Sequence, residues 1–526
     1  MRRGMRSGRF SRLFLAVLFL VAGCVKVGPD FAKPEAAVAP NWLEAGDKRV
    51  STASEDYKDW WRVFNDPTLD RLIATAYRQN LTLRLAGVRV LRARAQLGIA
   101  IGEVYPQTQQ GLGSVIKERL SERASTAGGV GNFWQSTLGL TASWEIDFWG
   151  KFRRAVESAD ASLLAAAADY DNALVALTAD VGSSYVLSRT LENRLNIAHR
   201  NVDIQQESLQ IATARFEGGT TSQRDVEQAR TVLASTQATI PTLESQLRQT
   251  KNALCVLLGL PPEQLTDLLG RAAAIPAPPP QVAVGIPADL LRRRPDIQSA
   301  EYQAAAQCTQ IGVAKASLYP AFSLTGNFSF QASDIGTFAL GDMFQWRSRS
   351  GSFGPSFQWN ILNYGQITNL VRVQDARFQE LLIAYQNAVL RAQQEVEDGL
   401  IAFLKSQERA GFLVQSTAAA QRSVDLAILQ YREGITDFTT VLTAERELLT
   451  QQDNLATTLG EISRNLVAVY RALGGGWQLR EGDDFVPDSI KKAMAGRTNW
   501  GKLLAPAAHT PPPPEPPRSL IRLPDW

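Results

Sequence analysis

Cys24 is the residue of this 526-residue chain whose neighbours most clearly indicate a chemical reaction. It follows Val21, Ala22 and Gly23, and small residues immediately before a cysteine are typical of the site at which bacterial lipoprotein signal peptides are cleaved. In that interpretation the thiol receives a diacylglyceryl group and the new α-amine receives an acyl chain. Several acyl chains anchor a protein far more firmly than one. The alternative is an ordinary secretory signal in which the cysteine is incidental.

The segment before Cys24 has the composition of an export signal. Residues 1–23 contain five arginines, followed by the 11-residue apolar stretch from Leu13 to Gly23, which is too short to span a bilayer as a helix. Removal of this segment takes five positive charges from a formal net charge of +3 and leaves −2, so no nucleic-acid partner is expected. Valine rather than aspartate follows Cys24, which by resemblance to other lipoproteins favours the outer membrane.

The composition argues against an enzyme. The chain has two histidines, His199 in a helical pattern and His509 in a Pro-rich tail, so neither a histidine-metal cluster nor a histidine-based triad is expected. Phosphate-binding glycine motifs are absent, and no cofactor or metal is predicted. Cys255 and Cys308 lie among small and apolar residues and are interpreted as core residues, with a disulfide between them as the alternative.

The chain contains a tandem repeat. The segment from Trp144 to Gly150 (WEIDFWG) recurs as Trp359 to Gly365 (WNILNYG), 215 residues later. A Tyr-Pro pair at residues 105–106 recurs at residues 319–320. One displacement that holds over about 150 residues indicates duplication of a structural unit. The predicted parts are a signal peptide (1–23), an N-terminal lipid-anchored extended segment (24–65), a first repeat (66–260), a Pro-rich linker (261–286), a second repeat (287–475) and a Pro-rich, disordered C-terminal segment (476–526).

Each repeat is predicted to contain one very long helix. No proline occurs between Gly150 and Phe216, or between Gly365 and Tyr431, and about 66 residues at 1.5 Å each give a helix near 100 Å long. Apolar and small residues recur in alternating steps of four and three, which is typical of coiled-coil packing. The two seams are Leu163, Ala167, Tyr170, Leu174, Leu177, Val181 and Ser184, and Phe378, Leu382, Tyr385, Val389, Ala392, Val396 and Gly399.

The strands suggest a membrane wall. Residues 137–146, 322–330 and 352–361 alternate apolar with small polar side chains, whereas residues 107–116 alternate poorly. Such strands of about ten residues match a transmembrane β-barrel, with a soluble β-sandwich as the alternative. Four strands cannot close a barrel, so other copies must complete it: two copies would give eight strands and three would give twelve with a lumen.

These features together resemble the TolC-type outer-membrane efflux duct family, in its NodT-like lipoprotein branch. The resemblance rests on Cys24 followed by VGPDF (27–31), on Trp60 and Trp61 ahead of Asp66, and on the repeat. It implies a mixed α and β membrane protein: a homotrimeric, twelve-stranded outer-membrane β-barrel continuous with a long periplasmic α-helical coiled-coil barrel. It also implies a periplasmic adaptor and an inner-membrane transporter of the resistance-nodulation-division (RND) class as partners.

The resemblance further implies a gate at the periplasmic helix tips, where the coiled coils constrict and then untwist to open. The tip turns would lie at residues 218–224 and 433–439, with Gly218, Gly219 and Gly434 in them. Asp225 matches a family aspartate that links to a tyrosine, matched here by Tyr431.

Three threonines depart from the family pattern. Thr436 stands where an arginine strengthens the tyrosine link, and Thr440 and Thr443 stand where the best-known member has aspartate rings that attract cations. Asp437 is then the candidate for an acidic ring. The alternative for Asp225 and Asp437 is helix capping alone, and both roles are compatible.

The function predicted from the sequence is therefore an outer-membrane efflux duct that passively conducts drugs or other small molecules. Metal efflux, type I protein secretion and a non-channel, lipid-anchored coiled-coil scaffold are the alternatives. Only four methionines occur, so a methionine relay for copper or silver has no support.

Overall fold

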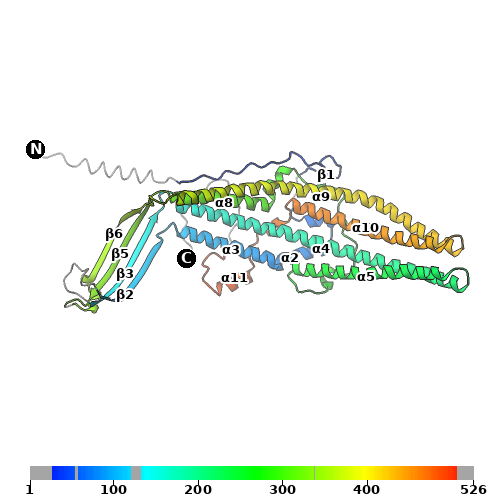
Figure 1. The fold of residues 1–526 in the computed structure, drawn as a ribbon, viewed down its shortest axis with the longest axis horizontal. Helices are drawn as coiled ribbons and strands as arrows, with labels where there is room; N and C mark the ends of the chain where they lie inside the picture. Colours follow the sequence, from blue (N-terminus) through cyan, green and yellow to red (C-terminus); the bar gives the residue numbers. More distant parts are fainter. Residues whose placement is uncertain (1–25, 54–56, 120–131, 337, 506–526) are drawn as a thin grey trace.

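The computed structural model describes residues 26–53, 57–119, 132–336 and 338–505 (Figure 1). The predicted signal peptide, the lipidation site Cys24 and the Pro-rich end of the chain lie outside the described residues. The molecule is elongated, with a β-sheet at one end and two helical hairpins at the other. None of the described helices combines the length and the apolar character needed to cross a membrane.

The two predicted long helices are confirmed. Helices α4 (Lys151–Glu217) and α9 (Gln366–Arg432) have 67 residues each, which corresponds to about 100 Å. Each returns through a hairpin into a helix of 35 residues, α5 (Gln223–Leu257) and α10 (Phe438–Ala472). Each is preceded by a helix of 22 residues, α3 (Leu81–Gly102) and α8 (Pro295–Ala316). The order and the lengths of these elements are therefore the same in both halves.

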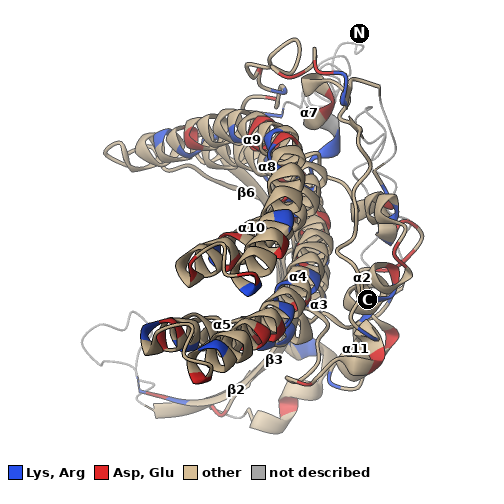
Figure 2. Ribbon diagram, turned by 90° about the vertical axis from the view of Figure 1, so that its right-hand side faces the viewer, with Lys and Arg blue, Asp and Glu red and all other residues tan. Residues whose placement is uncertain are grey.

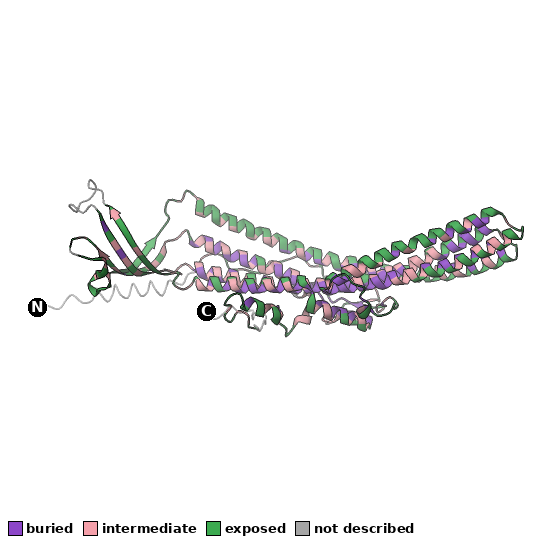
Figure 3. Cartoon of the chain, turned by 90° about the horizontal axis from the view of Figure 1, so that it is seen from below, coloured by how far each residue is buried: buried purple, intermediate pink, exposed green. Residues whose placement is uncertain are grey.

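The helices form a curved layer rather than a closed bundle (Figure 2). On the side of the sheet the order across the layer is α9, α8, α4 and α3, and on the side of the tips it is α9, α10, α4 and α5. Helix α4 thus lies in the middle, and α9 lies at one edge of the layer. Much of the sheet-side half of α9 is exposed in a single chain (Figure 3).

The predicted coiled-coil seams form the core. Tyr170, Leu174 and Val181 of α4, together with Tyr385 and Val396 of α9, are almost fully buried in one apolar cluster. The same cluster includes the paired tryptophans of the 3₁₀-helix Trp60–Phe64. Helix α2 (Pro67–Gln79) packs on α4 and starts at Asp66, whose carboxylate accepts a hydrogen bond from the Thr68 amide at 2.9 Å.

The sheet has four antiparallel strands in the order β2, β3, β5, β6: β2 (Thr108–Arg119), β3 (Asn132–Ile146), β5 (Ala321–Ser333) and β6 (Arg349–Gln358). Because directly paired residues share a face, the apolar residues of β3, β5 and β6 form one continuous surface. This surface faces outward: Leu140 is 64% and Phe353 is 79% exposed. An apolar outer surface is what a strand needs in contact with lipid.

The predicted strand 352–361 is wrong at its end, because β6 stops at Gln358. Gln358 pairs with Ala321, and the next position on β5 is Pro320, which has no amide hydrogen to continue the ladder. The poorly alternating segment 107–116 is nevertheless a strand, and β2 extends to Arg119.

The predicted extended N-terminal segment is present as a strap along α9. Main-chain amides of Ala39 and Leu43 donate to Gln393 and Glu397 of α9, each at 2.8 Å. The strap ends in β1 (Val50–Ser51), which pairs in parallel with β4 (Val282–Ala283) of the Pro-rich linker. Further short elements are α6 (Thr266–Leu269), α7 (Leu290–Arg293) and the 3₁₀-helices Pro287–Asp289, Leu340–Phe344 and Trp346–Ser348.

The prediction of a disordered C-terminal segment is wrong for residues 477–505. They include the 3₁₀-helix Trp477–Arg480 and helix α11 (Asp488–Ala495), and Phe485 is buried in the main core. Arg480 makes two hydrogen bonds, at 2.6 and 2.8 Å, to the Asp171 carboxylate of α4. The composition of the prolines after residue 510 therefore does not extend to the residues before it.

Candidate functional site

The two helical hairpins end in tip turns of the same construction. In the first turn the Thr220 amide donates to the Arg215 carbonyl at 2.9 Å, and in the second the Ile435 amide donates to the Gln430 carbonyl at 2.9 Å. This six-to-one bond defines a Schellman motif, which requires a left-handed residue after the helix. Residues 219 and 434 are those residues, with φ of +70° and +76°, and both are glycine. The preceding Gly218 has an ordinary φ of −78°.

An apolar cluster holds the four helices together next to the turns. It includes Ala212 of α4, Val226 of α5, Val424 of α9 and Val441 of α10. The ring of Tyr431 packs against Phe438 with 4.9 Å between the ring centroids. The tips are therefore packed structures, even though they end in solvent.

Asp225 lies within its own turn. It is 8% exposed, and its carboxylate accepts hydrogen bonds from the hydroxyls of Thr221 and Ser222, the second at 3.3 Å. The hydroxyl of Tyr431 is buried and finds no hydrogen-bond partner among the described residues. Within one chain the structure therefore brings Asp225 and Tyr431 to the same tip without joining them by a hydrogen bond.

Asp437 caps helix α10. Its carboxylate accepts hydrogen bonds from the amide and the hydroxyl of Thr440, at 3.0 and 3.1 Å. The Thr436 hydroxyl donates to the Thr440 hydroxyl at 3.1 Å, and the Thr443 hydroxyl donates to the Thr439 carbonyl at 2.8 Å. The threonines that replace the family's charged residues are thus occupied within their own helix end. Asp437 is exposed, so capping leaves its charge in solvent.

Arginines connect the two hairpins at the tips, and the sequence analysis missed them. The guanidinium of Arg215 lies 4.6 Å from the ring centroid of Tyr431 and donates to the Tyr431 carbonyl. Arg432 forms an ion pair with Glu207 of α4. A cation over an aromatic face and a charge-assisted hydrogen bond each stabilise this junction. In this chain Arg215, rather than a residue of the second turn, holds Tyr431.

Polar side chains also line the contact between α4 and α10, which we call the α4–α10 seam. Arg194 binds Asp453 at 2.6 Å, and Asn201 donates to Gln452 at 2.7 Å. Ser208, a further seven residues along α4, donates to Glu445. The spacing of Arg194, Asn201, Ser208 and Arg215 is seven residues, which is the signal in the sequence that could have identified this row.

The repeated sequence motifs meet where the sheet joins the helices. The indole of Trp144 donates to the Val104 carbonyl at 3.1 Å, and the indole of Trp359 donates to the Leu318 carbonyl at 3.0 Å. Each tryptophan therefore holds the residue that precedes a Tyr-Pro pair. Since both rings also suit a membrane interface, one residue type meets both requirements.

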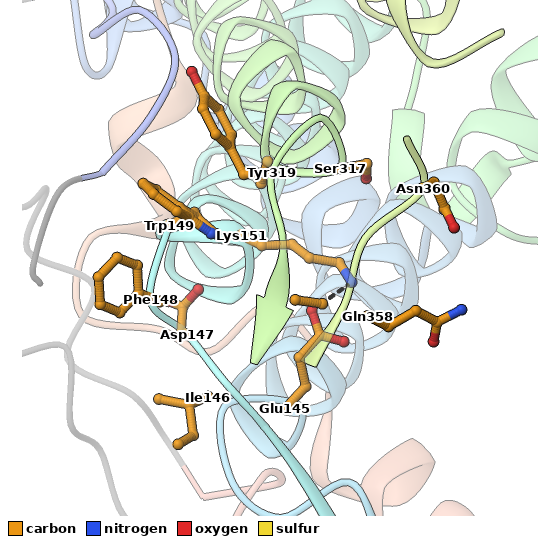
Figure 4. A pocket seen from close by; sticks show the side chains of 12 residues that line it. Glu145, Ile146, Asp147, Phe148, Trp149, Lys151, Ser317, Tyr319, Gln358 and Asn360 are labelled. Atoms are coloured by element: carbon orange, nitrogen blue, oxygen red, sulfur yellow. Dashed lines mark hydrogen bonds and ion pairs between the residues drawn. The ribbon is translucent and has the colours of Figure 1, made fainter. Parts of the chain in front are cut away.

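The same junction contains a small hollow lined by residues of both halves (Figure 4). Trp149 stacks on Tyr319 with 4.6 Å between the ring centroids and donates to the Pro320 carbonyl at 2.8 Å. Lys151 forms an ion pair with Glu145 across the hollow at 3.1 Å. These contacts fix the angle at which β3 enters α4. In the described part of the chain, no group of three or more His, Cys, Asp or Glu side chains could hold a metal ion.

A helical layer of about 100 Å that ends in a sheet with an apolar outer face defines the class of outer-membrane channels. The family model described as "Outer membrane efflux protein" matches residues 72–260 and, separately, residues 286–475. The chain belongs to this family, which is a family of transport proteins, and it is an outer-membrane protein.

Relatives and solved structures agree with this assignment. Nodulation protein T of Rhizobium leguminosarum bv. trifolii is 31% identical over 476 residues, which cover 90% of this chain and 98% of the relative. The pyoverdine export outer membrane protein OpmQ of Pseudomonas putida is 34% identical over 433 residues, covering 80% and 88%. The outer-membrane channel OprN superposes with a TM-score of 0.80 at 33% identity, covering 86% of this chain and 99% of OprN. The resemblance to the efflux duct family is thereby confirmed.

Proposed function

We propose that three copies of this chain form the exit duct of a tripartite efflux pump, through which small molecules pass passively to the exterior. Its observation of greatest weight is the open sheet: β2 and β6 each have one neighbour, although the outer face is apolar. Unpaired strand edges cannot be left in lipid. Three copies supply twelve strands, enough for a β-barrel with a lumen. The helical layers would then close into a periplasmic α-helical barrel.

The register of the sheet supports closure between copies. Thr108 pairs with Ser143 in β2–β3, and Ala321 pairs with Gln358 in β5–β6, which lie 213 and 215 residues further along the chain. The two hairpins of one chain are therefore paired in the same register. A third kind of pair, β3 with β5, joins the hairpins to each other. In a closed ring, β6 and the β2 strand of the next copy form the equivalent of that third pair.

The same displacements give the register of this junction. Ile146 lies opposite Phe322 in β3–β5, so Ile361 would lie opposite Gln109 of the next copy. Residues 359–361 would then join the strand that the sequence predicted, because a partner with free amides replaces Pro320. The missing end of β6 is thus accounted for by the neighbour that a single chain lacks.

The helices support the same arrangement. Val175 of α4 is 4% exposed, whereas Leu390, 215 residues later on α9, is 53% exposed. Ala168 and Ile383 form a second such pair, at 4% and 56%. Positions that α4 buries in the middle of the layer are therefore apolar but uncovered on α9. Packing of α9 against α3 and α5 of the next copy would cover them.

We also propose that the tips form the gate. Three symmetry copies would bring the hairpin ends together around one axis, where Asp437 would form a ring of carboxylates that favours cations. Opening would part the α9–α10 hairpin from α4 and α5 by releasing the contacts of Asp225, Tyr431, Thr436, Thr440 and Thr443 in and between the turns. The polar α4–α10 seam suits such a movement, because a polar contact loses less on exposure to water than an apolar one.

The partners and cargo follow from the family and from the names of relatives. Relatives in Pseudomonas putida are named as outer membrane proteins of toluene and solvent efflux pumps. We therefore propose a periplasmic adaptor (membrane fusion protein) and an inner-membrane RND-type transporter as partners, and small molecules as cargo. Metal efflux and type I secretion are the competing cargo assignments, and a non-channel scaffold is the competing class. A diacylglyceryl and acyl group on Cys24 would anchor the duct.

Crosslinking tests the assembly. Phe357 would face Gly113 of the next copy, so a chain carrying both Gly113→Cys and Phe357→Cys should give dimer and trimer bands after oxidation. The matched control moves one cysteine to Phe353, four residues or about 13 Å along β6, and should give none. The same purified protein should conduct ions in planar bilayers. Monomers with both cysteine pairs, together with no conductance, would leave the scaffold as the better assignment.

A further inference from the structure

The α4–α10 seam contains one carboxyl group that is enclosed on all sides. Glu445 of α10 is 1% exposed, and its only hydrogen-bond donor among the described residues is the hydroxyl of Ser208 on α4. Its second oxygen, Oε2, is buried without a partner in the described structure. Gln205, one turn before Ser208, is 2% exposed, and both polar atoms of its side-chain amide also lack a described partner. The seam thus encloses polar groups that its own contacts do not satisfy.

The charged groups around Glu445 are engaged elsewhere. On α4, Glu207 is paired with Arg432 of α9, and Arg215 lies over the Tyr431 ring. On the remaining helices the nearest charged groups are exposed to solvent: Arg446 and Glu447 on α10, Arg422 and Asp425 on α9, and Arg230 on α5. No described residue forms an ion pair with Glu445, so no neighbouring cation compensates its charge.

The repeat gives a comparison for this position. Arg230 lies 215 residues before Glu445, at the equivalent site of α5, and it is exposed and paired with Glu227 at 3.0 Å. The buried carboxyl therefore belongs to the contact between the two hairpins of one chain and has no counterpart in the first hairpin. Its placement is specific to the contact that parts in the proposed opening.

We propose that Glu445 is a proton-controlled lock of the tip: the α4–α10 seam packs fully around the neutral carboxylic acid, and release of the proton to water favours parting of the seam. The proposal rests on the gating movement proposed above. A buried carboxylate without a counter-ion is costly, whereas the neutral acid can donate its proton to a neighbouring acceptor such as the unpartnered oxygen of Gln205. When the seam parts, water solvates the carboxylate and the cost disappears.

Titration gives the lock a direction. Burial raises the pKa of the Glu445 carboxyl to about 7, and the hydrogen bond from Ser208 opposes this only in part. In the parted seam the carboxyl would return toward its ordinary value of 4.5. The closed form therefore binds the proton more tightly, so acid favours closure. Between these two pH values the ratio of open to closed tips should rise by up to about tenfold per pH unit, and above pH 7 it should level off.

Two measurements on the full-length purified protein test the proposal. The first is conductance in planar bilayers from pH 5 to 8.5. The second is hydrogen exchange in residues 441–452, corrected for the intrinsic effect of pH on exchange. In the wild type, conductance should rise and protection should fall toward neutral pH. Glu445→Gln retains the acceptor for Ser208 but cannot ionise, so both quantities should become independent of pH.

Matched controls isolate the carboxyl. Glu447→Gln removes an exposed carboxylate two residues away and should keep the wild-type pH profile. His199→Gln should also keep it, which excludes the one imidazole among the described residues, since such groups titrate near neutrality. A Glu445→Gln protein with the wild-type exchange profile, or a wild type without pH dependence, would overturn the lock. Absence of conductance with the expected exchange profile would instead contradict the duct and leave the lock intact.

Discussion

Gly460→Ala tests the close approach of α10 to α4 on which the seam depends. A Cβ atom at Gly460 would lie 2.2 Å from the Thr190 hydroxyl oxygen and 2.9 Å from its methyl carbon. Both distances are far below van der Waals contact, so the two helices must separate or Thr190 must leave its place. Overpacking of this kind costs about 1–3 kcal/mol per chain. We expect a lower midpoint of thermal unfolding and a higher basal conductance of the purified protein.

The chain provides a matched control for this substitution. Gly411 also lies inside a long helix, but a Cβ atom there would meet nothing within 4 Å. Gly411→Ala should therefore stabilise the protein by up to about 1 kcal/mol through helix propensity alone. The difference between the two variants measures the steric term without the effect of glycine on the unfolded chain.

Removal of the obstacle should rescue the variant. Thr190→Ala deletes the hydroxyl and the methyl group and leaves Cβ, which lies 3.0 Å from the new atom. The single Thr190 variant loses a hydrogen bond of 2.8 Å to the Val186 carbonyl, worth about 1 kcal/mol. The double variant should therefore be more stable than Gly460→Ala alone. Equal stability of Gly460→Ala and Gly411→Ala would refute the argument, because the seam would then have room that the structure denies it.

Three further substitutions test other parts of the molecule. Leu390→Asp should weaken trimers by about 2–4 kcal/mol at each junction, through lost apolar burial and a buried carboxyl, whereas Asn387→Asp on the opposite face should not; native mass spectrometry measures both. Arg215→Met should raise basal conductance, since it removes a cation–π contact and a hydrogen bond worth about 1–2 kcal/mol together; unchanged conductance would mean that this contact does not hold the tip. Cys24→Ser should abolish fatty-acid labelling, and labelling that persists would contradict the lipoprotein assignment.

Much of the fold could be predicted because the long helices and the strands have strong internal periods. The seam residues Tyr170, Leu174 and Val181 recur every three or four positions, and burial of such a stripe fixes a helix face. The helix ends were also visible, because glycines at residues 219 and 434 terminate the pattern. Local signals of this kind do not depend on which segments later become neighbours.

The remainder depends on contacts between distant segments. The end of β6 is set by Pro320 on a neighbouring strand, and the order of residues 477–505 is set by the burial of Phe485 and the pairing of Arg480 with Asp171. At the tip, Arg215 holds Tyr431 from another helix pair. Composition and period describe one segment at a time, so they could not show these partners.

The strap along α9 has a mechanical consequence. Near its start the Val27 amide donates to the Trp149 carbonyl at 3.1 Å, next to the sheet, and at its end Val50 is paired with Val282. An extended chain of some 24 residues fixed at both ends has little slack, since each residue spans at most about 3.5 Å. The strap is therefore a ruler of set length between the membrane face and the waist of the molecule. A pull on the N-terminus is carried into the helices at that waist, so the sheet is spared the load.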